Sequence, residues 1–109
     1  MPDEKKNYVV KNVETIMSDA HAQARVLTLG PGQEIPWHRH SEITDHYFVL
    51  RGKLTINMRE PDSRRELHVG NRQTITPGTG HLLSNKGNVD CEFLLLQGGG
   101  SYDWIKLQD

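Results

Sequence analysis

Short apolar or alternating runs, each bounded by a turn rich in glycine and proline, recur along most of this 109-residue chain. Successive side chains point to opposite faces of a strand, so Leu54, Ile56 and Met58 share one face within residues 53–58. Many short strands at this spacing predict an all-β sandwich or barrel. We expect one short helical piece, near Val13–Ala20. The expected strands are Ala24–Leu29, His46–Leu50, Lys53–Met58, Arg72–Thr76, His81–Ser84 and Cys91–Leu96.

The composition narrows the class of protein. A length of 109 residues predicts one domain over 1–109, with a core over about 22–97 and a C-terminal tail over 101–109. A formal net charge of −1 gives no general attraction to nucleic acid or anionic membranes, and we expect neither as a partner. No apolar run approaches the roughly 20 residues that span a bilayer, and the N-terminus lacks a signal-peptide pattern. A single cysteine, Cys91, excludes an internal disulfide and favours a cytoplasmic location.

Two histidine motifs carry the chemistry of the chain. His38 and His40 are two residues apart, so on a strand both side chains point to the same face. Asp45 and His81 bring a carboxylate and a third imidazole from other strands, and together such groups form a metal site. Imidazoles with one carboxylate suit Fe, Mn, Ni, Zn or Cu alike. We therefore expect one divalent transition metal (Fe, Mn, Zn or Ni), without a choice among them.

Both motifs resemble those of the cupin family. The first runs Gly32, five residues, His38-Arg39-His40, four residues, Asp45, six residues and Gly52, and the second runs from Gly70 to Pro77-Gly78, His81 and Asn85. The chain departs from the family where Asp45 stands in place of a glutamate and where Pro77 lies one place late. The resemblance implies a double-stranded β-helix, or jelly-roll, barrel. It also implies that His38, His40, His81 and Asp45 are the metal ligands.

Asp45 leaves three alternatives open. Its side chain is one methylene shorter than glutamate, which costs about 1.5 Å of reach. It binds the metal directly, or through a water, or it is free to act as a general base beside a three-histidine site. Glu42 is a second carboxylate nearby. Tyr47 and Gln33 are candidates to hydrogen-bond a substrate, and we assign Asp45 and Tyr47 as catalytic residues.

The strand at 91–96 predicts a second copy of the chain. Phe93 and Leu95 face one way while Leu94 and Leu96 face the other, so both faces of this strand are expected to be covered. Either the N-terminal strand or a partner subunit covers the outer face. Cupins commonly dimerise by such strand packing, and we expect a homodimer.

Apolar residues are expected around the metal. Met58, Leu83, Phe93 and Leu95 join Tyr47 on the inward face and would line an apolar pocket. Such a lining suits a small organic ligand. A glycine-rich joint then leads into the tail, which contains Trp104. This residue either closes the mouth of the barrel or packs on a dimer partner, and we favour packing.

The fold does not determine the reaction. Relatives implied by the resemblance include dioxygenases, isomerases, decarboxylases, polyketide cyclases, storage proteins and sensor domains. Our first hypothesis is a metalloenzyme that acts on a small aromatic or polyketide-like molecule as a dioxygenase, cyclase or isomerase. The alternative is a non-catalytic small-molecule binding or sensor module in which the metal is structural. The sequence contains no fused DNA-binding domain, which mildly favours the enzyme while leaving both hypotheses open.

Overall fold

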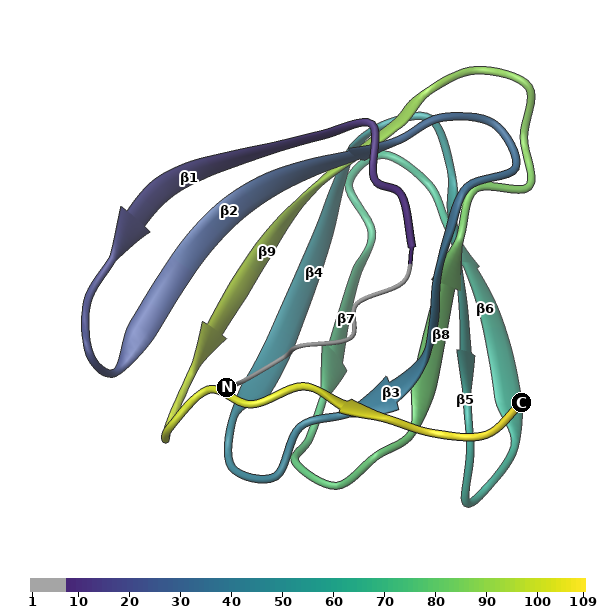
Figure 1. Ribbon diagram of the computed structural model, residues 1–109. Helices are drawn as coiled ribbons and strands as arrows, with labels where there is room; N and C mark the ends of the chain where they lie inside the picture. The colour runs from purple at the N-terminus through teal and green to yellow at the C-terminus, as the bar shows by residue number, and fades with distance from the viewer. Residues whose placement is uncertain (1–7) are drawn as a thin grey trace.

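The structure, a computed structural model, describes residues 8–109 and consists of two five-stranded sheets that face each other (Figure 1). Strand order is β1-β2-β9-β4-β7 in one sheet and β10-β3-β8-β5-β6 in the other, and every neighbouring pair is antiparallel. The strands are β1 Asn12–Ser18, β2 Ala22–Leu29, β3 Glu34–Arg39, β4 Thr44–Arg51, β5 Leu54–Met58, β6 Ser63–Leu67, β7 Arg72–Ile75, β8 His81–Ser84, β9 Cys91–Gly98 and β10 Ile105–Lys106. The predicted all-β fold is confirmed.

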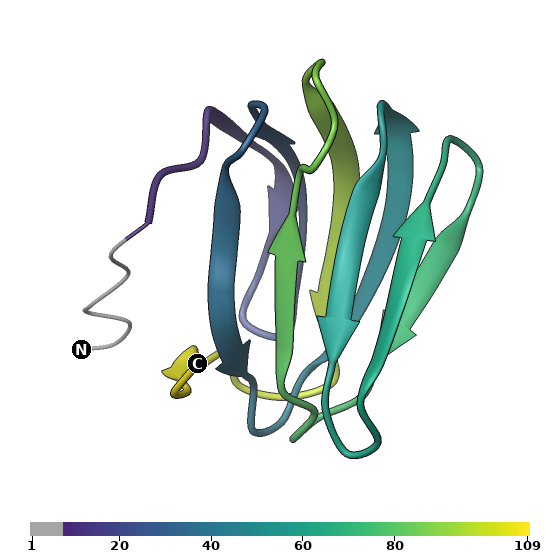
Figure 2. The ribbon, with the colours of Figure 1, turned by 90° about the vertical axis from the view of Figure 1, so that its right-hand side faces the viewer.

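The core lies between the two sheets, which appear as two layers in Figure 2. Strand β9 alternates between buried and half-buried residues along its whole length, as its sequence predicts. Met58 packs against the core from a partly buried position. The buried residues of this core are Leu27, Leu29, Ile35, Tyr47, Val49, Leu54, Ile56, Leu67, Ile75, Leu83, Cys91, Phe93 and Leu95. The expected lining residues are therefore confirmed as inward-facing.

The helix expected near Val13–Ala20 is wrong, because this segment forms β1 and pairs with β2. The register shifts between Thr15 and Met17, which marks a bulge at Ile16. A bulge adds one residue to the strand, and so it separates the apolar positions by three and four residues, as on a helix. Residues 8–109 contain no helix, and therefore none long and apolar enough to cross a membrane.

The glycines of the first histidine motif form turns. Gly32 and Gly52 have φ angles of 81° and 74°, in the left-handed region that residues with a Cβ rarely adopt. Asn85, the last residue of the second motif, is buried and donates hydrogen bonds to the carbonyls of Leu29 and Val89, both at 2.8 Å. These motif residues therefore hold the loops that set the ends of the strands.

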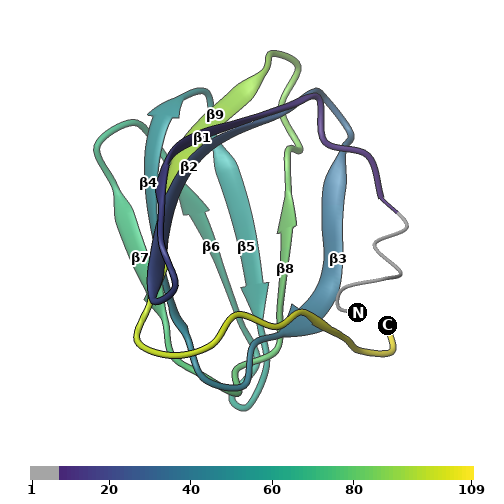
Figure 3. The same cartoon turned by 60° about the vertical axis from the view of Figure 1, so that its left-hand side comes forward.

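The C-terminal tail returns across one end of the sandwich (Figure 3). The chain turns at Gly100, where a Cβ would meet Glu42 Cβ at 2.6 Å. Beyond the turn, β10 pairs with the end of β3, and the amide of Leu107 donates to the carbonyl of Trp37 at 2.9 Å. The tail therefore packs on its own chain beside the His38-Arg39-His40 segment.

Candidate metal centre

Three histidines meet between the sheets. His38 is on β3, His40 follows that strand, and His81 opens β8, which pairs with β3 so that His38 and His81 lie opposite each other. All three side chains are buried. Their ligand atoms lie within 4.8 Å of one another. The structure therefore brings together the three imidazoles that the spacing predicts.

Backbone carbonyls fix the tautomer of each imidazole. The Nδ1 atoms of His38, His40 and His81 lie 2.8, 2.6 and 2.9 Å from the carbonyl oxygens of Pro36, Asp103 and Thr79. A carbonyl only accepts hydrogen bonds, so each Nδ1 carries the proton and the neutral ring presents the Nε2 lone pair. This second hydrogen bond is the arrangement that orients histidines bound to metals.

Asp45 reaches two of the histidines. It is fully buried on β4, and its Oδ2 lies 3.3 Å from the Nε2 atoms of both His40 and His81. Ligands of a tetrahedral metal with bonds of about 2.0–2.1 Å are about 3.3–3.4 Å apart. The other hydrogen bonds of the carboxylate come from Tyr47 Oη at 2.7 Å and Gln97 Nε2 at 2.9 Å. The shorter aspartate is therefore long enough to complete a ligand set with His40 and His81.

A cation is needed at the centre of this group. The Nε2 atoms of His40 and His81 are buried and have no hydrogen-bond partner among the described residues. Each faces a carboxylate oxygen, so acceptors point at acceptors unless a proton or a metal ion lies between them. The donor set of imidazoles and one carboxylate fits a divalent transition metal.

The protonation states favour metal binding. Burial, together with the nearby charge of His81, lowers the pKa of His38 to about 2, which keeps its ring neutral. Burial acts to raise the pKa of Asp45, but hydrogen bonds and charge from His40 and His81 outweigh it and hold the pKa below its ordinary value. Burial acts to lower the pKa of His40, but hydrogen bonds and charge from Asp45 and Asp103 outweigh it and raise the pKa above its ordinary value. The Asp45 carboxylate therefore favours a positive charge beside it, which either a proton on His40 or a metal ion can supply.

Tyr47 stays protonated. Burial and the neighbouring Asp45 charge raise its pKa well above the ordinary range of a phenol. Its hydroxyl donates to Asp45, so the structure directs the predicted substrate-binding group toward the carboxylate.

Aromatic residues of the tail cover the histidines. The Trp104 ring stacks on His38 with centroids 4.9 Å apart, and the Tyr102 ring lies 5.7 Å from that of His40. Between these rings and the core remains a cavity of about 30 Å³, room for about one water molecule. Trp104 therefore closes the cavity over the histidines of its own chain, which is the alternative that we did not favour, and its packing on a partner subunit stays a prediction.

Some predicted residues lie elsewhere. The Gln33 side chain accepts a hydrogen bond from the Gly30 amide at 2.7 Å and closes a turn, and it does not line the histidine cavity. Glu42 accepts from the Ser101 amide at 3.0 Å and holds the start of the tail. Cys91 is buried, and burial raises the pKa of its thiol to about 12, so it is not a nucleophile.

Sequence reasoning missed two polar residues of the inner face. Arg25 on β2 and Gln97 on β9 line the histidine cavity, and their side chains hydrogen-bond each other at 2.7 Å. The missed signal is the period of two along each strand. Arg25 shares a face with buried Leu27 and Leu29, and Gln97 shares a face with buried Leu95. A charged residue at an inward position of a core strand is uncommon and marks a functional site.

The sequence and the fold of this chain both resemble those of known proteins. Residues 25–97 match the cupin domain family. The chain belongs to the cupin family. Among solved structures, it resembles a protein with a double-stranded β-helix domain from Klebsiella pneumoniae, with 19% identity and a TM-score of 0.79 over 100% of this chain and 90% of that one. A comparison with curated proteins found no match.

Two further solved structures share the cupin fold. Oxalate oxidase matches with 17% identity and a TM-score of 0.72 over 80% of this chain, which spans only 46% of the oxidase. The protein KdgF from Halomonas sp. matches with 15% identity and a TM-score of 0.72 over 81% of this chain and 77% of its own. These likenesses establish the predicted double-stranded β-helix and carry no statement about substrate.

Proposed function

We propose that this cupin is a metalloenzyme that binds one divalent transition metal through His38, His40, His81 and Asp45 and acts on a small organic molecule. The observation that carries the proposal is the pair of buried Nε2 atoms that face one carboxylate oxygen and have no hydrogen-bond partner among the described residues. Oxalate oxidase, an enzyme by name, supports it by showing that this fold accommodates catalysis.

The residues have distinct roles in this proposal. A bound metal would act as a Lewis acid on an oxygen atom of the substrate. Three imidazoles and one carboxylate hold it, and the Tyr47 hydroxyl and the Gln97 amide orient the carboxylate. Asp45 serves better as a ligand than as a general base, because a base works best when its pKa lies near the operating pH and that of Asp45 is held low.

The lining of the site supports an organic substrate. Leu27, Ile35, Leu83 and Leu95 surround the histidine cavity together with aromatic rings. The apolar character of these side chains suits an aromatic or polyketide-like molecule, although the cavity itself holds only about one water molecule. The reactions that a metal and an apolar pocket suit are those of a dioxygenase, a cyclase or an isomerase.

Metal analysis tests the proposal first. Untagged protein, purified without chelators or nickel resin, is expected to contain about one transition metal ion per chain by plasma mass spectrometry. Iron would direct the search to oxygen consumption with aromatic diols and diketones, and zinc or manganese to cyclisation and isomerisation. Protein that is free of metal and takes up none when it is added would contradict the proposal.

The small size of the histidine cavity favours the alternative function, a non-catalytic binding or sensor module. About 30 Å³ beneath Trp104 leaves no room for an organic substrate at the histidines. A metal enclosed in this way would be structural, and the protein would be a binding or sensor module. Saturable ligand binding by the metal-loaded protein, with no turnover of any bound ligand, would establish the alternative.

Replacing Asp45 separates its three possible roles. We expect Asp45→Ala to lower metal affinity at least tenfold and to abolish turnover, because the variant loses the carboxylate that lies against His40 and His81. Metal titration and activity assays measure the two effects. Asp62→Asn, on the exposed β5–β6 hairpin, is the matched control and should change neither. Turnover lost with metal affinity intact would reassign Asp45 as a base.

We propose a homodimer formed through the outer face of the β1 sheet. Val26, Leu94 and Phe48 lie side by side across β2, β9 and β4, all half-buried, and Leu96 extends the row. A contiguous apolar face of this kind marks an interface. We expect light scattering to give the mass of a dimer for the wild type and of a monomer for Leu94→Glu. A monomeric wild type would contradict the proposal.

We also keep the proposal of a cytoplasmic location. It rests on the single cysteine, whose thiol is buried and unpaired.

A further inference from the structure

Arg25 carries a positive charge on the inner face of the sandwich. In the register of β2, β9 and β4, Arg25 lies opposite Leu95, and Leu95 lies opposite Tyr47. The next row along the same three strands is Gln23, Gln97 and Asp45. Two adjacent rows of the inner face therefore connect a guanidinium to the proposed metal ligand Asp45.

The guanidinium has unused hydrogen-bonding capacity. Its Nη2 donates to Gln97 Oε1 at 2.7 Å, while its Nε is buried and has no partner among the described residues. Within residues 8–109, no carboxylate forms an ion pair with Arg25. A half-buried guanidinium with an unpaired buried Nε and no ion-pair partner is a ready acceptor for an anionic ligand.

Gln97 couples this charge to the metal centre. Its Oε1 accepts from Arg25 and also from Gln23 Nε2 at 2.8 Å, which leaves its amide nitrogen to donate to Asp45 Oδ1 at 2.9 Å. One side chain therefore spans the distance between Arg25 and Asp45. A small molecule held by Arg25 is therefore long enough to extend toward the histidines.

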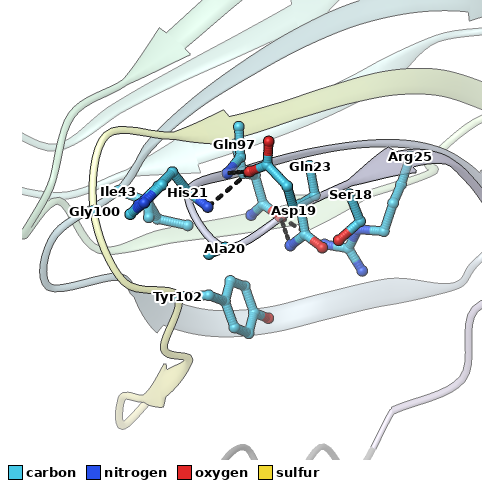
Figure 4. Close-up of a pocket in the computed structure, with 11 residues that line it drawn as sticks. Ser18, Asp19, Ala20, His21, Gln23, Arg25, Ile43, Gln97, Gly100 and Tyr102 are labelled. Carbon is cyan, nitrogen blue, oxygen red and sulfur yellow. Dashed lines mark hydrogen bonds between the residues drawn. The ribbon is translucent and has the colours of Figure 1, made fainter.

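An open pocket leads to Arg25 from solvent. Its volume is about 300 Å³, and Arg25, Gln97 and Tyr102 line both this pocket and the small histidine cavity (Figure 4). Asp19 also lines the pocket, but its Oδ1 accepts from the amides of His21 and Ala22. This pocket has the space for an organic molecule that the histidine cavity lacks.

We infer that Arg25 binds the carboxylate group of the substrate, so that the substrate class is a small organic carboxylic acid. This inference rests on the proposed metalloenzyme function. The planar guanidinium donates two parallel hydrogen bonds to a carboxylate, and the body of the acid occupies the open pocket with its reactive end toward the metal. A phosphate is a poorer match, because it carries nearly two charges and Arg25 is the one lysine or arginine among the described residues that line the two cavities.

Calorimetry on protein with its measured metal content tests the inference. The probes are benzoate, its neutral analogue benzamide, and inorganic phosphate. We expect benzoate to bind the wild type and Arg25→Met to weaken this binding at least about tenfold, with partial recovery in Arg25→Lys. Benzamide is expected to bind weakly and equally to all three proteins. Arg64→Met, which removes an exposed arginine from β6, is the matched control and should bind benzoate as the wild type does.

The outcomes separate this inference from the proposed function. Four results would each overturn the carboxylate assignment. In the first two, the wild type does not bind benzoate, or it binds benzoate no better than Arg25→Met does. In the other two, the wild type binds phosphate more tightly than benzoate, or it binds benzamide and benzoate equally. Absence of metal would instead contradict the metalloenzyme, and the same titration of metal-free protein then decides the role of Arg25 alone. Thermal melts confirm folding, and if Arg25→Met does not fold, Arg25→Lys decides by its weaker benzoate binding.

Discussion

In His81→Ala, the bound metal is expected to fall from about one ion per chain to less than about a tenth of that value, since one of three imidazole ligands is lost. His81 is fully buried, and its Nε2 lies 3.3 Å from Asp45 Oδ2. Within residues 8–109, the cluster contains only His38 and His40 besides His81, so no further histidine is there to replace it. Plasma mass spectrometry of matched preparations measures the loss.

The same variant should lose the stabilisation that metal gives to the folded protein. Metal at about one hundred times its Kd stabilises the native state by about 2.7 kcal/mol, provided that the unfolded chain does not bind it. For a chain of this size, that corresponds to a rise in Tm of roughly 10 °C. We expect the wild type to show this rise and His81→Ala to show almost none.

His46→Ala is the matched control. His46 is next to Asp45 on β4 but has the opposite phase, and its Nδ1 lies 3.1 Å from the Thr74 hydroxyl on the outer face. This variant also removes one imidazole, from the sheet that faces His81, and it should bind metal as the wild type does. If His81→Ala kept one ion per chain, or if His46→Ala lost it equally, the proposed centre would be wrong.

Local periodicity was sufficient to predict which side chains of the candidate site meet. A period of two places His38 and His40 on one face and Asp45 on the face of Tyr47, and burial in the structure follows this phase. The turns around these strands have glycines with positive φ, so their positions could also be found from the sequence. The distance of Asp45 from the histidines could not be predicted, because it depends on how β4 lies against β3 and β8 in the facing sheet.

Contacts between distant residues account for what the sequence did not predict. The Asp103 carbonyl that accepts from His40 is 63 residues away along the chain, and no local pattern indicates that the tail returns to β3. Arg25 has an inward phase, but a charged residue is normally assigned to the surface. Its role becomes visible only when Gln97 and Asp45 are seen beside it. β1 was mistaken for a helix because a bulge changes the spacing of its apolar residues.

A chain that ends after Gly100 is expected to bind metal at least about tenfold more weakly than the wild type. This truncation removes the Asp103 carbonyl, which fixes the tautomer of His40, and the Trp104 ring, which covers His38. Without them the His40 ring is free to turn, and water reaches the imidazoles. Lost packing of Trp104 against the core should also lower the free energy of unfolding by roughly 3 kcal/mol, within the range for deleting a large aromatic side chain. Metal titration and chemical denaturation measure the two effects.

Two further variants decide whether the tail acts on the metal or only on stability. A chain ending after Leu107 lacks two exposed residues but keeps β10, and it should match the wild type in both measurements. Trp104→Ala keeps the Asp103 carbonyl, so it should be destabilised while retaining more of its metal affinity than the truncated chain. If the chain ending after Gly100 is destabilised but binds metal as tightly as the wild type, the tail contributes packing alone. If it loses metal affinity and Trp104→Ala does not, the hydrogen bond between the tail and His40 is part of the metal centre.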